Sequence, residues 1–176
     1  RGLSPLFFMT KQEHIEYLGQ LALALQKEKD FEWEQYVTNV SQSSIQERIN
    51  SGVTWYPLQV IEEGIGLGSY PFLIVKRHKG PSKHKFKAGQ PVSFFSELQE
   101  NRNQSVVGRA VWVSENEMKV HFKIDELPEW MGDGKIGVNA AFDEKTFLEM
   151  MKALNLVMND EKSNISFLRD AVWKDV

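Results

Sequence analysis

The hydrophobic periodicity of this chain changes twice, and these changes limit the folds available to it. Through residues 10 to about 50, apolar residues recur at the three- and four-residue spacing of amphipathic helices. From residue 53 to about 142, β-branched and aromatic residues form short runs between turn residues, which is typical of strands. From Asp143 the helical spacing returns. This order predicts an α+β fold in which a sheet is inserted between helical segments.

The strand-rich block predicts a small antiparallel β-barrel of six strands. The clearest hairpin joins residues 106–113 to residues 118–124. In its second strand apolar and polar residues alternate strictly, as in a strand with one buried face. Pro57 lacks an N–H group, so it favours a sheet edge or a bulge within the first run of strand-forming residues.

These patterns divide the chain into a helical stalk at residues 9–52, a barrel at 53–142 and returning helices at 143–176. Residues 1–8 precede Met9 and lack the small-residue cleavage site of a signal peptide. We expect that Met9 is the natural start and that residues 1–8 are a cloning-derived or disordered leader.

Two positions carry helix-capping signals. Thr10, with Glu13 three residues later, fits a capping box at the start of the stalk. Ser43 or Ser44 fits the start of a short helix that Gly52 would end. Between these signals the pattern is compatible with two helical segments or with one long bent helix.

The composition of the chain indicates the cellular compartment in which it works. The chain has no cysteine, which excludes disulfides and thiolate sites and fits a reducing environment. No apolar run approaches the length of a membrane helix. We therefore expect a cytoplasmic protein with no membrane partner.

Catalytic patterns are incomplete in this chain. The glycine-rich run at 64–68 precedes a strand and does not match a phosphate-binding loop, so we interpret it as a hairpin turn. None of the four histidines lies at metal-ligand spacing from a second histidine. The carboxylates around Trp130 lie in a loop with nothing to desolvate them. We predict no catalytic, cofactor-binding or metal-binding residue.

One basic run stands out against an acidic remainder, since the net charge of the whole chain is −3. No acid interrupts it, and such a run can neutralise phosphates without reading sequence. Phe86 lies within it, and Tyr70 and Phe72 lie just before it; these aromatics either stack on bases or belong to the core. The predicted nucleic-acid-binding residues of the run are Lys76, Arg77, Lys79, Lys83, Lys85 and Lys87.

The order of elements and four segments of apolar residues and glycines carry a family resemblance. The segments are SSIQERINSGVTWYPLQVIEEGIGLGSYPFLIVKR, FKAGQPVSFFSE, VVGRAVWVSENEMKVHF and IGVNAAFDEKTFLEMMKAL. Together they resemble the N-terminal region of superfamily 1 helicases of the nonsense-decay-factor and immunoglobulin-mu-binding-protein type. In that family a helical stalk carries a β-barrel, called 1B, and the chain returns to a RecA-like motor domain.

The resemblance implies an accessory domain that touches a nucleic-acid strand while the motor domains turn over ATP. It places ATP and Mg²⁺ in those motor domains, so these residues alone would not hydrolyse ATP. The expected partners are single-stranded DNA or RNA, bound weakly by the isolated acidic chain, and the RecA-like motor domains. Arg109 and Lys123, on the long predicted hairpin, are secondary contact candidates.

Two alternatives remain open. A free-standing β-barrel module that binds a protein partner through its helical arm would explain the acidic surface without nucleic acid. A small hydrolase would use the carboxylates between Asp125 and Asp133, but the chain shows no matching nucleophile pattern.

Overall fold

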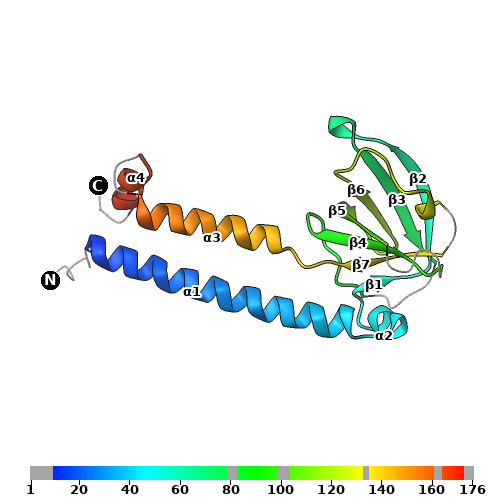
Figure 1. Cartoon of the computed structure of the whole chain (residues 1–176), viewed down its shortest axis with the longest axis horizontal. Helices are drawn as coiled ribbons and strands as arrows, with labels where there is room; N and C mark the ends of the chain where they lie inside the picture. The colour runs from blue at the N-terminus through cyan, green and yellow to red at the C-terminus, as the bar shows by residue number, and fades with distance from the viewer. Residues whose placement is uncertain (1–9, 79–82, 99–103, 133–134, 161–163, 173–176) are drawn as a thin grey trace, which may run out of the picture. The chain divides into compact units, whose positions relative to one another are not determined.

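The computed structural model describes residues 10–78, 83–98, 104–132, 135–160 and 164–172. The expected leader and Lys79 lie outside the described residues. Within them the α+β prediction is confirmed, because the described residues form four α-helices and one sheet. Figure 1 shows their arrangement along the chain. The helices are α1 (Lys11–Tyr36), α2 (Ile45–Asn50), α3 (Glu144–Asn159) and α4 (Asn164–Val172). The strands are β1 (Thr54–Trp55), β2 (Leu58–Ile65), β3 (Pro71–Arg77), β4 (Pro91–Ser96), β5 (Ser105–Val113), β6 (Glu117–His121) and β7 (Ile136–Ala140).

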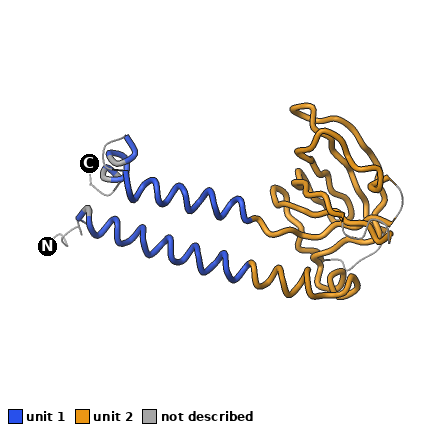
Figure 2. The backbone as a smooth tube through the Cα atoms, viewed as in Figure 1, with its two compact units in different colours: residues 1–32, 144–176 blue, residues 33–143 orange. Residues whose placement is uncertain are grey.

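The chain divides into two compact units, coloured separately in Figure 2. One unit holds residues 1–32 and 144–176, and the other holds residues 33–143. In the first unit α1 and α3 lie side by side, and Lys29 forms an ion pair with Glu144 at 3.6 Å. The second unit contains α2 and the whole sheet.

The sheet corrects the predicted six-stranded barrel. Seven strands pair antiparallel in the order β1-β7-β4-β5-β6-β3-β2. In the described part of the chain no ladder joins β1 to β2, so the sheet is open and these two strands are its edges. The predicted hairpins are present as β2–β3 and β5–β6.

The extra strand arises at Pro57. Residues 53–61 read as one run of strand-forming residues, but only Tyr56 and Pro57 separate the end of β1 from the start of β2. Trp55 pairs with Val138 of β7, whereas Leu58 pairs with Arg77 of β3. Proline cannot donate to a ladder, and the chain changes partner there. Because so short a link spans only about 11 Å, the sheet must curl until its two edges approach each other at this corner.

The inner face of the curled sheet carries the core. The alternation predicted for residues 118–124 is confirmed in β6, where Met118 and Val120 are fully buried. The strand itself ends at His121, so Lys123 lies beyond it. Buried residues of the core cluster are Trp55, Leu58, Leu73, Val75, Phe86, Val92, Phe94, Ala110, Met118, Val120, Phe122, Trp130, Met131, Ile136 and Val138.

The capping predictions are also confirmed. Thr10 and Glu13 exchange hydrogen bonds at the start of α1, which continues as one helix to Tyr36 and then a π-helical turn. Ser44 is the N-cap of α2 and forms a full capping box with Glu47. The chain leaves α2 toward the sheet through Gly52, whose φ of +77° favours glycine.

Candidate nucleic-acid interface

Residues 83–87, which we call the basic segment, alternate between exposed and more buried side chains, the pattern of an extended chain. Lys83, Lys85 and Lys87 are exposed, whereas His84 is half-buried and Phe86 is buried. Successive side chains of an extended chain point to opposite sides, so the three ammonium groups project from one side. Alternate positions lie about 6.6 Å apart along such a chain, which suits successive phosphates of an extended strand.

The inward residues anchor the basic segment to the sheet. The rings of Phe86 and His84 meet the Trp55 indole edge-on, at centroid distances of 5.2 Å and 5.1 Å. His84 Nε2 lies 3.0 Å from the Ser114 carbonyl oxygen. The inward side of the segment is therefore held by two partners, a core tryptophan and the turn between β5 and β6.

A glycine allows this close approach. The Lys85 N–H donates to the Gly52 carbonyl oxygen at 2.9 Å. A Cβ on Gly52 would lie 3.1 Å from both the Lys83 carbonyl oxygen and the His84 Cα. The left-handed backbone of Gly52 and this crowding both require the residue to lack a side chain.

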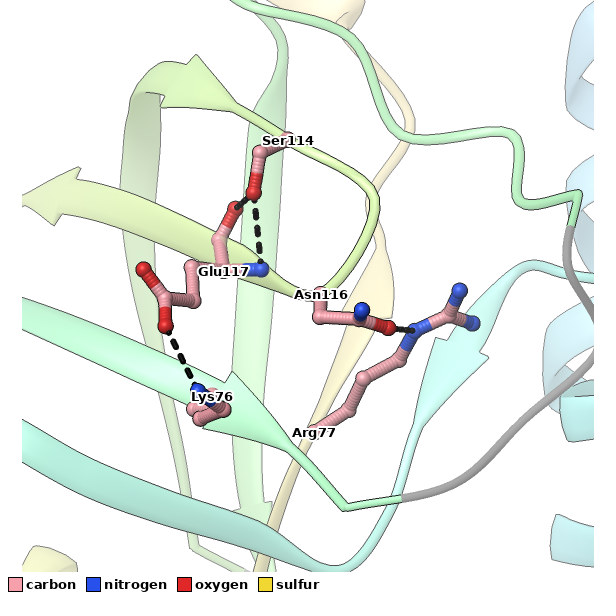
Figure 3. A network of polar contacts seen from close by, with 5 residues as sticks. All are labelled: Lys76, Arg77, Ser114, Asn116 and Glu117. Atoms are coloured by element: carbon pink, nitrogen blue, oxygen red, sulfur yellow. Dashed lines mark hydrogen bonds and ion pairs between the residues drawn. The ribbon is translucent and has the colours of Figure 1, made fainter.

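Lys76 and Arg77 lie at the end of β3, and Figure 3 shows both engaged within the fold. Lys76 Nζ lies 2.9 Å from Glu117 Oε1. Arg77 is buried and donates from Nε to Asn116 Oδ1 at 3.3 Å. Burial lowers the pKa of Arg77, opposed by Glu115, but a guanidinium remains charged at neutral pH. Both cations already have polar partners, whereas no ion pair to Lys83, Lys85 or Lys87 is seen among the residues that the structure describes.

The two secondary candidates lie apart. Arg109 on β5 contacts Asp143 at 3.4 Å and 3.5 Å and donates to the Gly89 carbonyl oxygen, two residues beyond Lys87. Lys123 is exposed past the end of β6, and no contact among the described residues links it to the basic segment. The structure therefore places Arg109, and not Lys123, next to the chain that leaves the basic segment.

A further cation that sequence reasoning missed lies on the outer face of the sheet. Lys119 Nζ lies 3.7 Å from the centroid of the Phe72 ring, and His121 flanks the same ring at 5.9 Å. The position of Lys119 was partly predictable from the sequence, because alternation places Lys119 and His121 on the polar face of their strand. Their pairing with β3 was not visible, since register cannot be read from one sequence.

The described residues were also compared with the requirements of a metal site and of a membrane-spanning helix. Among them, no group of three or more histidine or acidic side chains is arranged to hold a metal ion. None of their helices has both the length and the apolar composition needed to cross a membrane.

Comparison with known proteins adds no family assignment: no family model matches the chain, and no curated protein matches it in sequence.

Proposed function

We propose that this chain is an accessory nucleic-acid-binding domain of an ATP-dependent superfamily 1 helicase that acts in the cytoplasm. The helical unit would serve as the stalk, and the sheet unit would contact single-stranded DNA or RNA beside RecA-like motor domains. ATP and Mg²⁺ would bind in those motor domains. The proposal rests on the element order and on the geometry of the basic segment.

The observation that carries it is the row formed by Lys83, Lys85 and Lys87. Within the part of the chain that the structure describes, none of the three forms an ion pair. Their backbone is fixed by Phe86 and His84, so fewer conformations are lost when the ammonium groups meet an anion. Phosphate contacts of this kind carry no base readout and release counterions, so binding would be independent of sequence and sensitive to salt.

Burial argues against a stacking role for the aromatics of this region. Phe86 is 4% exposed and Phe72 is 8% exposed beneath Lys119, so neither presents a free ring face. Tyr70 is 39% exposed but belongs to the turn between β2 and β3. The interface would therefore work chiefly through charge, and the acidic remainder of the chain would keep the isolated domain a weak binder.

Titration with a fluorescein-labelled single-stranded oligonucleotide at several salt concentrations tests the proposal. We expect weak binding at low salt that falls steeply as salt rises, with similar affinity for unrelated sequences. Absence of binding at low salt, or affinity independent of salt, would reject the nucleic-acid function.

A protein-interaction module remains the second candidate, and one observation favours it. In the helical unit an apolar groove of about 360 Å³ runs between α1 and α3. Its lining consists of Leu18, Leu21, Leu25, Met150, Ala153, Leu154 and Val157. A stalk that docks against another domain would use the same groove, so only the oligonucleotide titration separates the two functions.

A further inference from the structure

Strand β2 is an open sheet edge of eight residues. In the described residues its one ladder partner is β3. The Gly66 N–H donates to the Tyr70 carbonyl oxygen at 2.8 Å, which fixes the alternation of hydrogen bonds along this hairpin. Gly64 and Glu62 then exchange hydrogen bonds with β3. The backbone groups of Glu63 and Ile65, at the intervening positions, face the open edge.

The exposed side chains of β2 are unusual for an unprotected edge. Ile61 is 48% exposed and Ile65 is 67% exposed. Natural edges are commonly protected by lysine, proline or a bulge. Here a register shift between Val60 and Glu62 interrupts only the first half of the strand, and the second half remains regular. The regular stretch from Glu62 to Ile65 can therefore accept another strand.

A cleft adjoins this edge. Its volume is about 410 Å³, and it lies between β2 and the segment 127–132. Its apolar lining includes Leu58, Val60, Leu73, Leu127, Met131 and Ile136. The carboxylates of Glu63 and Glu129 are also part of its wall.

We propose that β2 binds an extended, basic peptide segment of a partner protein by strand addition, with an apolar side chain of that segment in the cleft. Main-chain hydrogen bonds to Glu63 and Ile65 would align the segment, as in other complexes formed by strand addition. Glu62 and Glu63 point to opposite faces of β2, and Glu63 is on the face of the cleft. Basic residues that alternate with apolar ones would therefore lie beside the exposed carboxylate of Glu62 when an apolar side chain enters the cleft. Glu62 forms no ion pair with any residue that the structure describes. This site is separate from the basic segment and independent of the proposed nucleic-acid function.

Charge selects this partner over a second copy of the chain. Antiparallel pairing of two β2 strands about a two-fold axis at the outward-facing Glu63 would place the Glu63 carboxylates of both copies opposite each other. Like charges opposite each other across strands are destabilising. A strand with lysine on the face away from the cleft instead gains an opposite-charge pair with Glu62.

The test uses fluorescence anisotropy with the whole chain and a short labelled peptide in which lysine alternates with valine. A second peptide has the same side chains but carries N-methyl groups on the backbone nitrogens of its lysines, and a third carries them on its valines. Each methylated peptide lacks the main-chain N–H donors on one edge of its strand, and neither modification changes the charge of the peptide. We expect the unmodified peptide to bind and at least one methylated peptide to lose binding. Equal binding of all three would show charge attraction alone and overturn the proposal.

Variants of the chain locate the contact. Glu62→Lys should weaken binding of the peptide by about fivefold, because attraction becomes repulsion at this position. Glu28→Lys changes net charge equally at an exposed position of α1 and should leave affinity unchanged. Ile65→Pro should also abolish binding, because it removes an outward N–H at a position that does not bond to β3.

Near-UV circular dichroism of the buried tryptophans checks that each variant is folded. Unchanged peptide affinity in folded Ile65→Pro would overturn the proposal. Light scattering gives the remaining outcome: a dimer that Ile65→Pro dissociates would assign the edge to a second copy and would also overturn it.

Discussion

The guanidinium carbon of Arg77 lies 5.0 Å from the centroid of the Trp55 indole, and this contact separates two roles within one basic run. Trp55 also meets Phe86 and His84 of the basic segment. The same indole is therefore covered by a buried cation and by the residues that anchor the exposed lysines. Arg77 stabilises the platform on which Lys83 and Lys85 are displayed.

Truncating Arg77 should affect stability more than truncating its neighbour. Arg77→Ala removes a buried cation–π contact and the hydrogen bond to Asn116, so we expect a loss of about 2 kcal/mol in the free energy of unfolding. Lys76→Ala removes an exposed ion pair with Glu117 and should cost less than about 1 kcal/mol. Urea denaturation of both variants measures the difference. Equal losses would contradict the structural role of Arg77.

Shortening Phe86 should loosen the basic segment without removing charge. Phe86→Leu is expected to cost about 1 kcal/mol of stability, to speed amide hydrogen exchange in residues 83–87 and to lower oligonucleotide affinity. Phe147→Leu makes the same change at a buried site in α3 and should not alter affinity. Affinity that is unchanged in Phe86→Leu would show that anchoring of the segment is unimportant for binding.

Replacing glycine by alanine should change the stability of the protein in opposite directions at two positions. A Cβ on Gly108 would lie 2.4 Å from Val120 Cγ1 and 2.9 Å from the His121 carbonyl oxygen, so Gly108→Ala should destabilise the sheet by about 1–3 kcal/mol. Gly19 in α1 has no such neighbour within 4 Å, and Gly19→Ala should stabilise by about 0.5–1 kcal/mol. Thermal unfolding of both variants compares them directly, and a stabilising shift in Gly108→Ala would contradict the close packing of Gly108 against Val120.

The capping box of α2 predicts a pH effect. Hydrogen bonds from the Ser44 hydroxyl and backbone N–H lower the pKa of Glu47. A carboxyl whose pKa is lower in the folded state stabilises the fold above its unfolded pKa, and this contribution is lost as pH falls through the folded pKa. Ser44→Ala should raise the pKa of Glu47 toward its ordinary value, as followed by carbon-detected NMR titration. Ser43→Ala should leave it unchanged, because the Ser43 hydroxyl donates to the Thr38 carbonyl oxygen.

The amino-acid sequence was sufficient for the local features of this fold. Alternation around Met118 and Val120 identified a half-buried strand. The serines at 43 and 44, with Gly52, marked a short helix, because these signals depend on neighbours along the chain. The strand count failed at Pro57. A run of β-branched and aromatic residues does not show that its two halves pair with different strands, and open or closed sheets differ only in such long-range pairing.

The candidate site shows the same limit. Composition located the basic run, but it could not separate exposed Lys83 from buried Arg77, since both lie among similar residues in sequence. Their difference comes from Trp55 and Asn116, which are distant in sequence and adjacent in space. Lys119 was overlooked for the same reason, because its contact with Phe72 depends on the register between β3 and β6.

The most direct test of the account is the salt dependence of single-strand binding in Lys83→Glu with Lys85→Glu. For single strands the slope of log affinity against log salt is about 0.7 per neutralised phosphate, so loss of two contacts should reduce its magnitude by about 1.4 and lower the affinity at every salt concentration. The control, Lys27→Glu with Lys145→Glu, changes net charge equally at exposed positions of the helical unit and should keep the original slope. An unchanged slope and affinity in the Lys83 and Lys85 variant would contradict the assignment of the basic segment as the nucleic-acid interface.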